Sequence, residues 1–170
     1  MILRIVKEPH AILRHKANRV DQVTPEVKKL AANMIETMYA AEGVGLAANQ
    51  VGSPLNLFVA NPGNKQGEEL ILLNAVITHR AGEETSPEGC LSLPGISSPV
   101  TRAAEVTLTG MTLLNEKVTL QAKGFLAKIF QHEIDHLEGR LYPERLPAAE
   151  GKHLLAKYQK LAETLRRVDL

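Results

Sequence analysis

Cysteine is almost absent from this sequence, which has only Cys90 among its 170 residues. A single cysteine cannot form a disulfide within the chain, and this suits a protein of a reducing compartment. Cys90 is therefore a packing residue, a nucleophile or a metal ligand. Taken alone, packing is the first expectation, because free cysteine is among the most buried residue types.

An excess of charge of either sign is also missing. Lysines and arginines number 20 against 19 aspartates and glutamates, which gives a net charge of +1. This balance does not favour a polyanionic partner, so we expect no nucleic-acid binding.

Long apolar runs are missing as well, since none approaches the roughly 18 residues that a membrane-spanning helix needs. Charges interrupt the apolar residues at the N-terminus, so we expect neither membrane insertion nor a signal peptide. At 44% hydrophobic residues, the chain is predicted to form a single soluble domain over residues 1–170. Its expected location is the cytoplasm, or an organelle after processing.

Three segments have the three- and four-residue apolar spacing of amphipathic helices. The first is predicted to begin at Pro25, with Thr24 as its N-cap, and to stop near Gly43. The second is predicted over residues 125–137, between Gly124 and Gly139. A third over about 148–168 carries an apolar stripe and is predicted to cover the core at the C-terminus.

Short β-favouring runs lie between the first and second predicted helices, separated by glycine, proline and asparagine. They are residues 55–60, 70–73, 76–77, 106–109 and 118–120. One helix before them and two after favour an α+β fold with antiparallel strands over a regular βαβ repeat. The glycine-containing segment 43–50 is predicted to be a loop.

Within the second predicted helix, residues 132–136 read His-Glu-Ile-Asp-His and fit the pattern H-E-x-x-H. Positions i and i+4 share one helix face, so His132 and His136 can reach one metal ion. Glu133 can then lie beside the ion and take a proton from bound water. The alternative is a solvated helix face with two ordinary histidines.

A catalytic site of this kind needs a third protein ligand and an open position for water. No suitable histidine or glutamate follows the helix at the spacing of zincin-like proteases. Upstream, Cys90 stands in the segment Glu-Gly-Cys-Leu-Ser at residues 88–92, where Gly89 gives the backbone room. A Cys90 thiolate would complete a Cys-His-His set.

At this point the chain closely resembles the peptide deformylases. Three segments match that family's motifs in order: G-V-G-L-A-A-N-Q at 43–50, E-G-C-L-S at 88–92 and Q-H-E-I-D-H-L-E-G at 131–139. The resemblance spans residues 2 to about 145. It implies antiparallel β-sheets around a central metal-binding helix, with an N-terminal and a C-terminal helix.

The resemblance implies hydrolysis of the N-terminal formyl group of newly made formyl-methionyl polypeptides, with release of formate. Cys90, His132 and His136 would hold the metal, and Glu133 would move the protons. The side chain of Gln50 and the backbone N–H of Leu91 would stabilise the oxyanion. The family is associated with Fe²⁺, which Zn²⁺ or Ni²⁺ can replace, whereas ligand chemistry alone suggests zinc.

For the substrate, the expected partner is the nascent chain, together with the ribosome that makes it. The peptide is expected to pair with backbone near Gly45 and Gly89. Side chains of Val44, Phe125 and Ile129 are expected to line the methionine pocket, beside His132. Lys128 departs from relatives with an aliphatic residue there, and its stem either lines the pocket or faces away.

Three further residues match family positions: Glu88, Arg102 and Asp135. We expect them to orient the histidines and the cysteine loop, although ordinary surface pairs are nearly as consistent with the sequence.

Two rival functions remain open. The first is an H-E-x-x-H metallopeptidase, in which Cys90 would not be needed for metal binding. The second is a catalytically inactive module that binds nascent chains, although such a module would need neither Glu133 nor Gln50.

Overall fold

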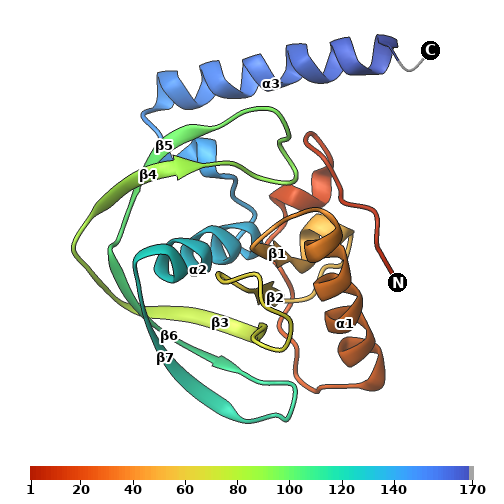
Figure 1. Cartoon of the computed structure of the whole chain (residues 1–170), viewed down its shortest axis with the longest axis vertical. Helices are drawn as coiled ribbons and strands as arrows, with labels where there is room; N and C mark the ends of the chain where they lie inside the picture. The colour runs from red at the N-terminus through yellow and green to blue at the C-terminus, as the bar shows by residue number, and fades with distance from the viewer. Residues whose placement is uncertain (169–170) are drawn as a thin grey trace.

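The computed structural model describes the backbone of residues 1–168 and the side chains of residues 1–166. Its strands form two antiparallel sheets (Figure 1). The larger has the order β1-β2-β3-β6-β7, built from β1 (Gly45–Ala47), β2 (Leu57–Ala60), β3 (Leu70–Ala81), β6 (Glu105–Met111) and β7 (Lys117–Lys123). The smaller pairs β4 (Glu84–Glu88) with β5 (Ser98–Arg102).

The helices occupy three separate places around these sheets. They are α1 (Pro25–Ala40), α2 (Gly124–Leu137) and α3 (Ala148–Val168), with short 3₁₀ turns η1 (Ala11–Arg14), η2 (Ala48–Val51) and η3 (Tyr142–Arg145). Figure 1 shows α2 between the large sheet and the β4–β5 pair, with α3 along the outer side of that pair. The predicted α+β fold with a central helix is therefore confirmed.

Helix α1 begins where the sequence predicts. The Thr24 hydroxyl accepts a hydrogen bond from the backbone N–H of Val27 at 3.4 Å, and Pro25 occupies the first turn, where its missing N–H costs nothing. The buried face of the helix, including Met34 and Met38, packs against β1 and β2. Apolar spacing and an N-cap together are sufficient to define this element.

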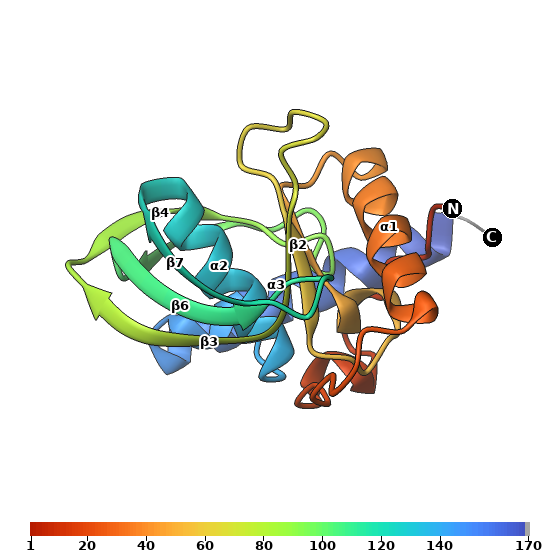
Figure 2. The ribbon, with the colours of Figure 1, turned by 90° about the horizontal axis from the view of Figure 1, so that it is seen from below.

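Helix α2 is held by the core that it shares with the large sheet (Figure 2). Phe130 on the helix meets Phe58 of β2 edge to face, with ring centroids 5.7 Å apart. After the helix ends, Gly139 adopts a φ of +76°, and a Cβ there would collide with the carbonyl of Arg14. The chain can turn away from α2 at this point only because residue 139 lacks a side chain.

Helix α3 has the predicted bounds and covers a separate apolar cluster. Leu154 and Tyr158 on its inner face are buried with Tyr142 of η3 and with Leu93 and Val100 from the β4–β5 region. The predicted C-terminal cover is confirmed. The single-domain prediction for 1–170 stays a prediction, because residues 169–170 lie outside the described part.

Several strand predictions were wrong in detail. The runs 70–73 and 76–77 belong to one strand, β3, which has an irregular register around Asn74, a residue with φ +54°. The predicted loop 43–50 contains β1 and most of η2. Strands β4 and β5 were not predicted, because Pro87 and Pro99 stand in them and proline has a low β-propensity. Among the described residues, no helix combines the length and apolar character needed to cross a membrane.

Candidate metal centre

Three side chains that could ligate a metal converge beside α2. Cys90 follows the end of β4, and His132 and His136 lie one turn apart on α2. Their ligand atoms all lie within 4.8 Å of one another, and Cys90 Sγ is 3.3 Å from His136 Nε2. Bonds of about 2.3 Å to sulfur and 2.0–2.1 Å to imidazole nitrogen would place two tetrahedral ligands of one ion roughly 3.6 Å apart.

The donor set therefore fits a divalent metal. Two imidazoles and one thiolate are borderline-soft ligands, and three protein ligands leave a position for water. The Glu88 carboxylate is hydrogen-bonded to His132 Nδ1 at 2.9 Å, which leaves Nε2 of His132 as the coordinating atom. Burial lowers the pKa of His136 well below its usual value, so this ring is neutral at pH 7, as a ligand must be.

Glu133 lies beside the three candidate ligands and is 4% exposed. Its Oε2 atom has no hydrogen-bond partner among the described residues, and burial raises the pKa of this carboxyl to about 7. Opposite it, Gly45 leaves the necessary space, because a Cβ at residue 45 would collide with the Glu133 carboxylate. Glu133 can therefore exchange a proton near neutral pH.

Gln50 presents its amide nitrogen to the same cleft. The backbone N–H of Ala47 donates to Gln50 Oε1 at 2.9 Å, which orients the side chain. Gln50 Nε2 then faces Ser92 Oγ at 3.2 Å and Cys90 Sγ at 3.6 Å. The backbone N–H of Leu91, in the cysteine loop, shows no hydrogen bond within the described part of the chain.

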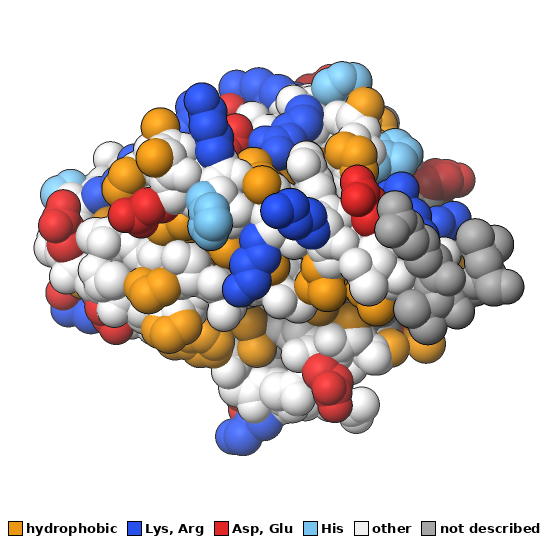
Figure 3. Space-filling model, turned by 90° about the horizontal axis from the view of Figure 1, so that it is seen from above, with side chains coloured by type: hydrophobic (Ala, Val, Ile, Leu, Met, Phe, Trp, Pro, Cys, Tyr) orange, Lys and Arg blue, Asp and Glu red, His pale blue; other side chains and the backbone are white. Residues whose placement is uncertain are grey.

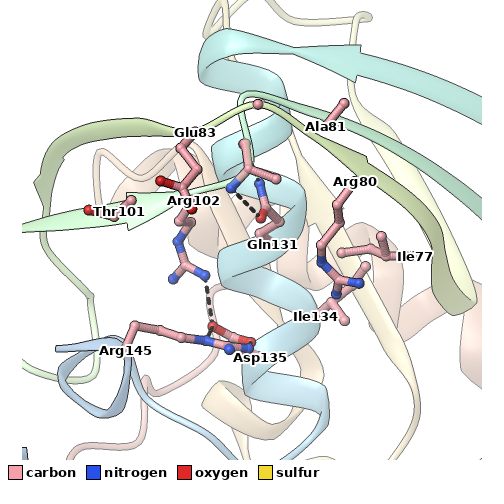
Figure 4. A pocket seen from close by; sticks show the side chains of 12 residues that line it. Ile77, Arg80, Ala81, Glu83, Thr101, Arg102, Gln131, Ile134, Asp135 and Arg145 are labelled. Atoms are coloured by element: carbon pink, nitrogen blue, oxygen red, sulfur yellow. Dashed lines mark hydrogen bonds and ion pairs between the residues drawn. The ribbon is translucent and has the colours of Figure 1, made fainter. Parts of the chain in front are cut away.

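A buried ion-pair network supports the histidines from behind. Arg102 donates to both oxygens of Glu88 and, at 2.8 Å, to Asp135. Arg145 also donates to Asp135, and Figure 4 shows both guanidinium groups directed at this carboxylate. Burial opposes ionisation of Glu88, but hydrogen bonds from His132 and Arg102 outweigh it and lower its pKa to about 2.

Cys90 and His132 line a cleft of about 450 Å³ between α2, the β1 region and the cysteine loop. All five residues predicted to bind substrate line this cleft: Val44, Gly45, Gly89, Phe125 and Ile129. Phe125 is 49% exposed, while Ile129 is buried. The cleft thus combines apolar walls with the polar side chains of the candidate metal ligands.

Lys128 also lines the cleft rather than facing away. Its ammonium donates to the carbonyl of Pro87 in β4 and lies 5.8 Å from the centroid of the Phe125 ring. The side chain therefore connects α2 to β4 across one wall of the cleft, with its charge at an exposed position.

Proteins of one known family resemble this chain in sequence. The sequence profile described as polypeptide deformylase matches residues 2–152. The chain belongs to this family. A peptide deformylase of Symbiobacterium thermophilum is 46% identical over 144 residues, covering 85% of this chain and 66% of that protein. One of Aquifex aeolicus is 41% identical over 167 residues, covering 96% and 99%.

Solved structures of the polypeptide deformylase family agree over the whole fold. A peptide deformylase from Legionella pneumophila matches with a TM-score of 0.92 at 34% identity, covering 98% of this chain and 99% of that one. The enzyme from Thermus thermophilus matches with a TM-score of 0.89 at 39% identity, covering 98% and 97%. The predicted family, fold and enzyme class, a metal-dependent hydrolase, are confirmed.

The structure also adds residues that the sequence did not single out. Ser92 contacts Gln50 and donates its backbone N–H to Cys90 Sγ at 3.4 Å. The Tyr142 ring stacks on His132 with centroids 6.2 Å apart, and Arg145 completes the pairing of Asp135. Only Ser92 had a signal, its place two residues after Cys90, because Tyr142 and Arg145 reach α2 through the tertiary fold.

Proposed function

We propose that this protein hydrolyses the N-terminal formyl group of formyl-methionyl polypeptides, releasing formate and a free amine. One observation carries the proposal: one cleft holds a Cys-His-His cluster, an oriented amide and a buried glutamate whose Oε2 has no partner among the described residues. Family membership assigns the same chemistry to this fold.

In the proposed reaction, Cys90, His132 and His136 would hold one divalent metal. An ion bound there would supply Lewis acidity, which would lower the pKa of a water molecule in the cleft. Glu133 accepts the proton of that water as the formyl carbon is attacked, and later gives it to the leaving amine. Its pKa of about 7 suits both directions of transfer.

The negative charge that develops on the formyl oxygen needs donors that are already in place. We assign this role to Gln50 Nε2 and the Leu91 backbone N–H. The hydrogen bond from Ala47 to Gln50 Oε1 supports the assignment, because it fixes which end of the amide faces the cleft. A preorganised donor of this kind is typically worth about 3–4 kcal/mol in the transition state.

Substrate binding is assigned to the cleft walls. We propose that Val44, Phe125 and Ile129 contact the methionine side chain, and that backbone near Gly45 and Gly89 pairs with the extended peptide. Small residues at 45 and 89 support this arrangement, since the peptide backbone must approach closely.

The main test is whether the protein prefers a formyl peptide to an acetyl peptide. Anaerobically prepared, metal-loaded protein is incubated with formyl-Met-Ala and with acetyl-Met-Ala, and formate, acetate and free amine are measured. We expect rapid formate release and little cleavage of the acetyl peptide. Absence of formate, or equal cleavage of both peptides, would overturn the proposal.

The alternative, an H-E-x-x-H metallopeptidase, has no support in the comparisons. The two functions differ in their third ligand, so the Cys90→Ala variant separates them. We expect this variant to lose bound metal, measured by elemental analysis after gel filtration. A metallopeptidase site would keep its metal and cleave internal peptide bonds.

For the physiological metal we propose Fe²⁺, with Zn²⁺ or Ni²⁺ able to replace it. A thiolate ligand supports oxygen sensitivity of an iron form, because Cys90 is a free, half-buried cysteine and a thiolate is open to oxidation. The Fe²⁺ protein should lose activity in air within hours while the Ni²⁺ protein keeps it. Full activity of both forms in air would exclude this choice.

We further propose that the protein acts beside the ribosome, in a bacterial cytoplasm or an organelle. Figure 3 looks onto α3, where lysine and arginine side chains gather on the outer surface. Helix α3 contributes three exposed lysines, Lys152, Lys157 and Lys160. Cosedimentation with 70S ribosomes that weakens with added salt is expected, and cosedimentation unchanged by Lys157→Ala/Lys160→Ala would contradict a role for this face.

A further inference from the structure

Three consecutive residues near the N-terminus are bonded to the loops that surround Cys90 and Gln50. The backbone N–H of Val6 donates to the Gln50 carbonyl at 2.7 Å, and that of Glu8 donates to the Ser92 carbonyl at 3.1 Å. Between them, Lys7 Nζ donates to the Leu91 carbonyl at 2.5 Å. The segment therefore holds two functional loops at once, although it lies far from both in sequence.

The contact of Lys7 is directed at one particular peptide group. The Leu91 carbonyl and the Ser92 N–H are the two ends of a single planar peptide. The Ser92 N–H donates to Cys90 Sγ at 3.4 Å. The ammonium of Lys7 thus sits at the carbonyl end of the peptide whose other end faces the candidate thiolate ligand.

A cation at a carbonyl oxygen polarises the whole peptide and makes its N–H a stronger donor, because hydrogen bonds in a chain reinforce one another. It also fixes the rotation of that peptide plane. The preceding peptide, which contains the Leu91 N–H, shares the Leu91 Cα and is restrained with it.

We propose that Lys7 is a positioning residue of the metal centre. It orients and polarises the Leu91–Ser92 peptide, which strengthens the N–H···S hydrogen bond to the Cys90 thiolate and holds the Leu91 N–H where the oxyanion forms. The inference deepens the proposed function and rests on it for the roles of Cys90 and Leu91.

The competing interpretation is an ordinary surface lysine. Lys7 is exposed, and an exposed lysine contact often contributes nothing measurable to stability. The two interpretations differ in what they predict at the sulfur atom, because a surface contact has no effect on the electronic state of a bound thiolate.

The test uses Co²⁺-loaded protein, in which a thiolate ligand gives a charge-transfer absorption band. Lys7→Met removes the ammonium but keeps an apolar stem of similar length, and Lys7→Arg restores a cation. Arg4→Met is the matched control: it removes the same charge from the same segment, and Arg4 makes no hydrogen bond to the cysteine loop within the described residues. Kinetics with formyl-Met-Ala are measured on the same samples.

A weaker hydrogen bond raises the energy of the sulfur lone pairs, so the band of Lys7→Met should move to longer wavelength. The bands of Lys7→Arg and Arg4→Met should stay near the wild-type position. The kcat of Lys7→Met should fall by about threefold to tenfold with little change in KM, which corresponds to the loss of one hydrogen bond.

An unchanged band in Lys7→Met would overturn the inference, and so would an equal shift in Arg4→Met. The thiolate band and the formate release of the wild-type protein show whether this inference or the proposed function has failed. If wild type shows the thiolate band but releases no formate, the proposed substrate is wrong, and the band of Lys7→Met still decides the role of Lys7. If wild type shows no thiolate band, Cys90 is not a ligand and both proposals fall.

Discussion

Two glutamates close to His132, Glu88 and Glu133, are almost equally buried, but their pKa values shift in opposite directions. Glu88 is 3% exposed and Glu133 is 4% exposed. Glu88 accepts hydrogen bonds from His132 and, at both oxygens, from Arg102, and these lower its pKa to about 2. Glu133 has one oxygen without a partner in the described part of the chain, and burial raises its pKa to about 7.

The difference shows that burial alone does not decide what a carboxylate does. Burial raises the pKa of both residues, and only hydrogen-bonding partners reverse the effect at Glu88. A carboxylate with hydrogen-bond partners on both oxygens stays ionised at neutral pH, so Glu88 can orient His132 and Arg102. A carboxylate that lacks such partners and has a pKa near 7 can carry a proton, so proton transfer is expected at Glu133.

The largest expected effect on activity comes from removing the ionisable group of Glu133. Glu133→Gln should lower kcat by about 10²–10⁴-fold, because the amide cannot carry the proton. Metal content and thermal unfolding should stay close to wild type, since Glu133 Oε2 bonds to no described residue. Steady-state kinetics with metal analysis provide the measurement. Activity within tenfold of wild type would mean that another group moves the proton.

The second prediction concerns the oriented amide. Gln50→Ala should lower kcat by about 10²–10³-fold if its Nε2 stabilises the oxyanion. Loss of the bond from Ala47 to Gln50 Oε1 should also loosen this turn. Gln50→Glu serves as the comparison, because it keeps an acceptor for Ala47 and removes the donor. Equal kcat in Gln50→Glu and wild type would exclude the assigned role.

In the ion-pair network around Glu88, the main effect of a substitution should be on stability. Arg102→Met leaves Glu88 and Asp135 buried without their shared cation, which typically costs about 3–5 kcal/mol in the free energy of unfolding. Chemical denaturation of the metal-free protein measures this loss directly. If Arg102→Met unfolds at the wild-type denaturant concentration, the network does not carry the stability assigned to it.

The smallest effect is expected at the rim of the same network. The Arg145 side chain is 38% exposed, so its ion pair with Asp135 is screened by solvent. Arg145→Ala should cost about 1 kcal/mol, less than Arg102→Met, because Asp135 still accepts the hydrogen bond from Arg102. Denaturation of this variant beside Arg102→Met tests the comparison. A larger loss in Arg145→Ala would reverse the ranking.

The three α-helices and the pair of candidate histidine ligands could be predicted because their signals are local. Thr24 and Pro25 define the start of α1, and the i, i+4 spacing places His132 and His136 on one face of α2. Strands β4 and β5 were missed because their pairing, Glu88 with Ser98 among other pairs, depends on partners and not on the propensity of either segment.

By itself, the sequence determined which residue types are available for chemistry: one cysteine, an H-E-x-x-H helix and a glycine-rich segment that ends in Gln50. Only the tertiary structure decided the state of each group. Glu88 and Glu133 are the same residue type, and their pKa values differ because His132 and Arg102 hydrogen-bond to Glu88, whereas Glu133 Oε2 has no partner among the described residues. Nothing in the sequence singles out Lys7, and only the fold places its ammonium at the Leu91 carbonyl. Such effects act over a few ångströms between residues distant in sequence, and no local pattern encodes them.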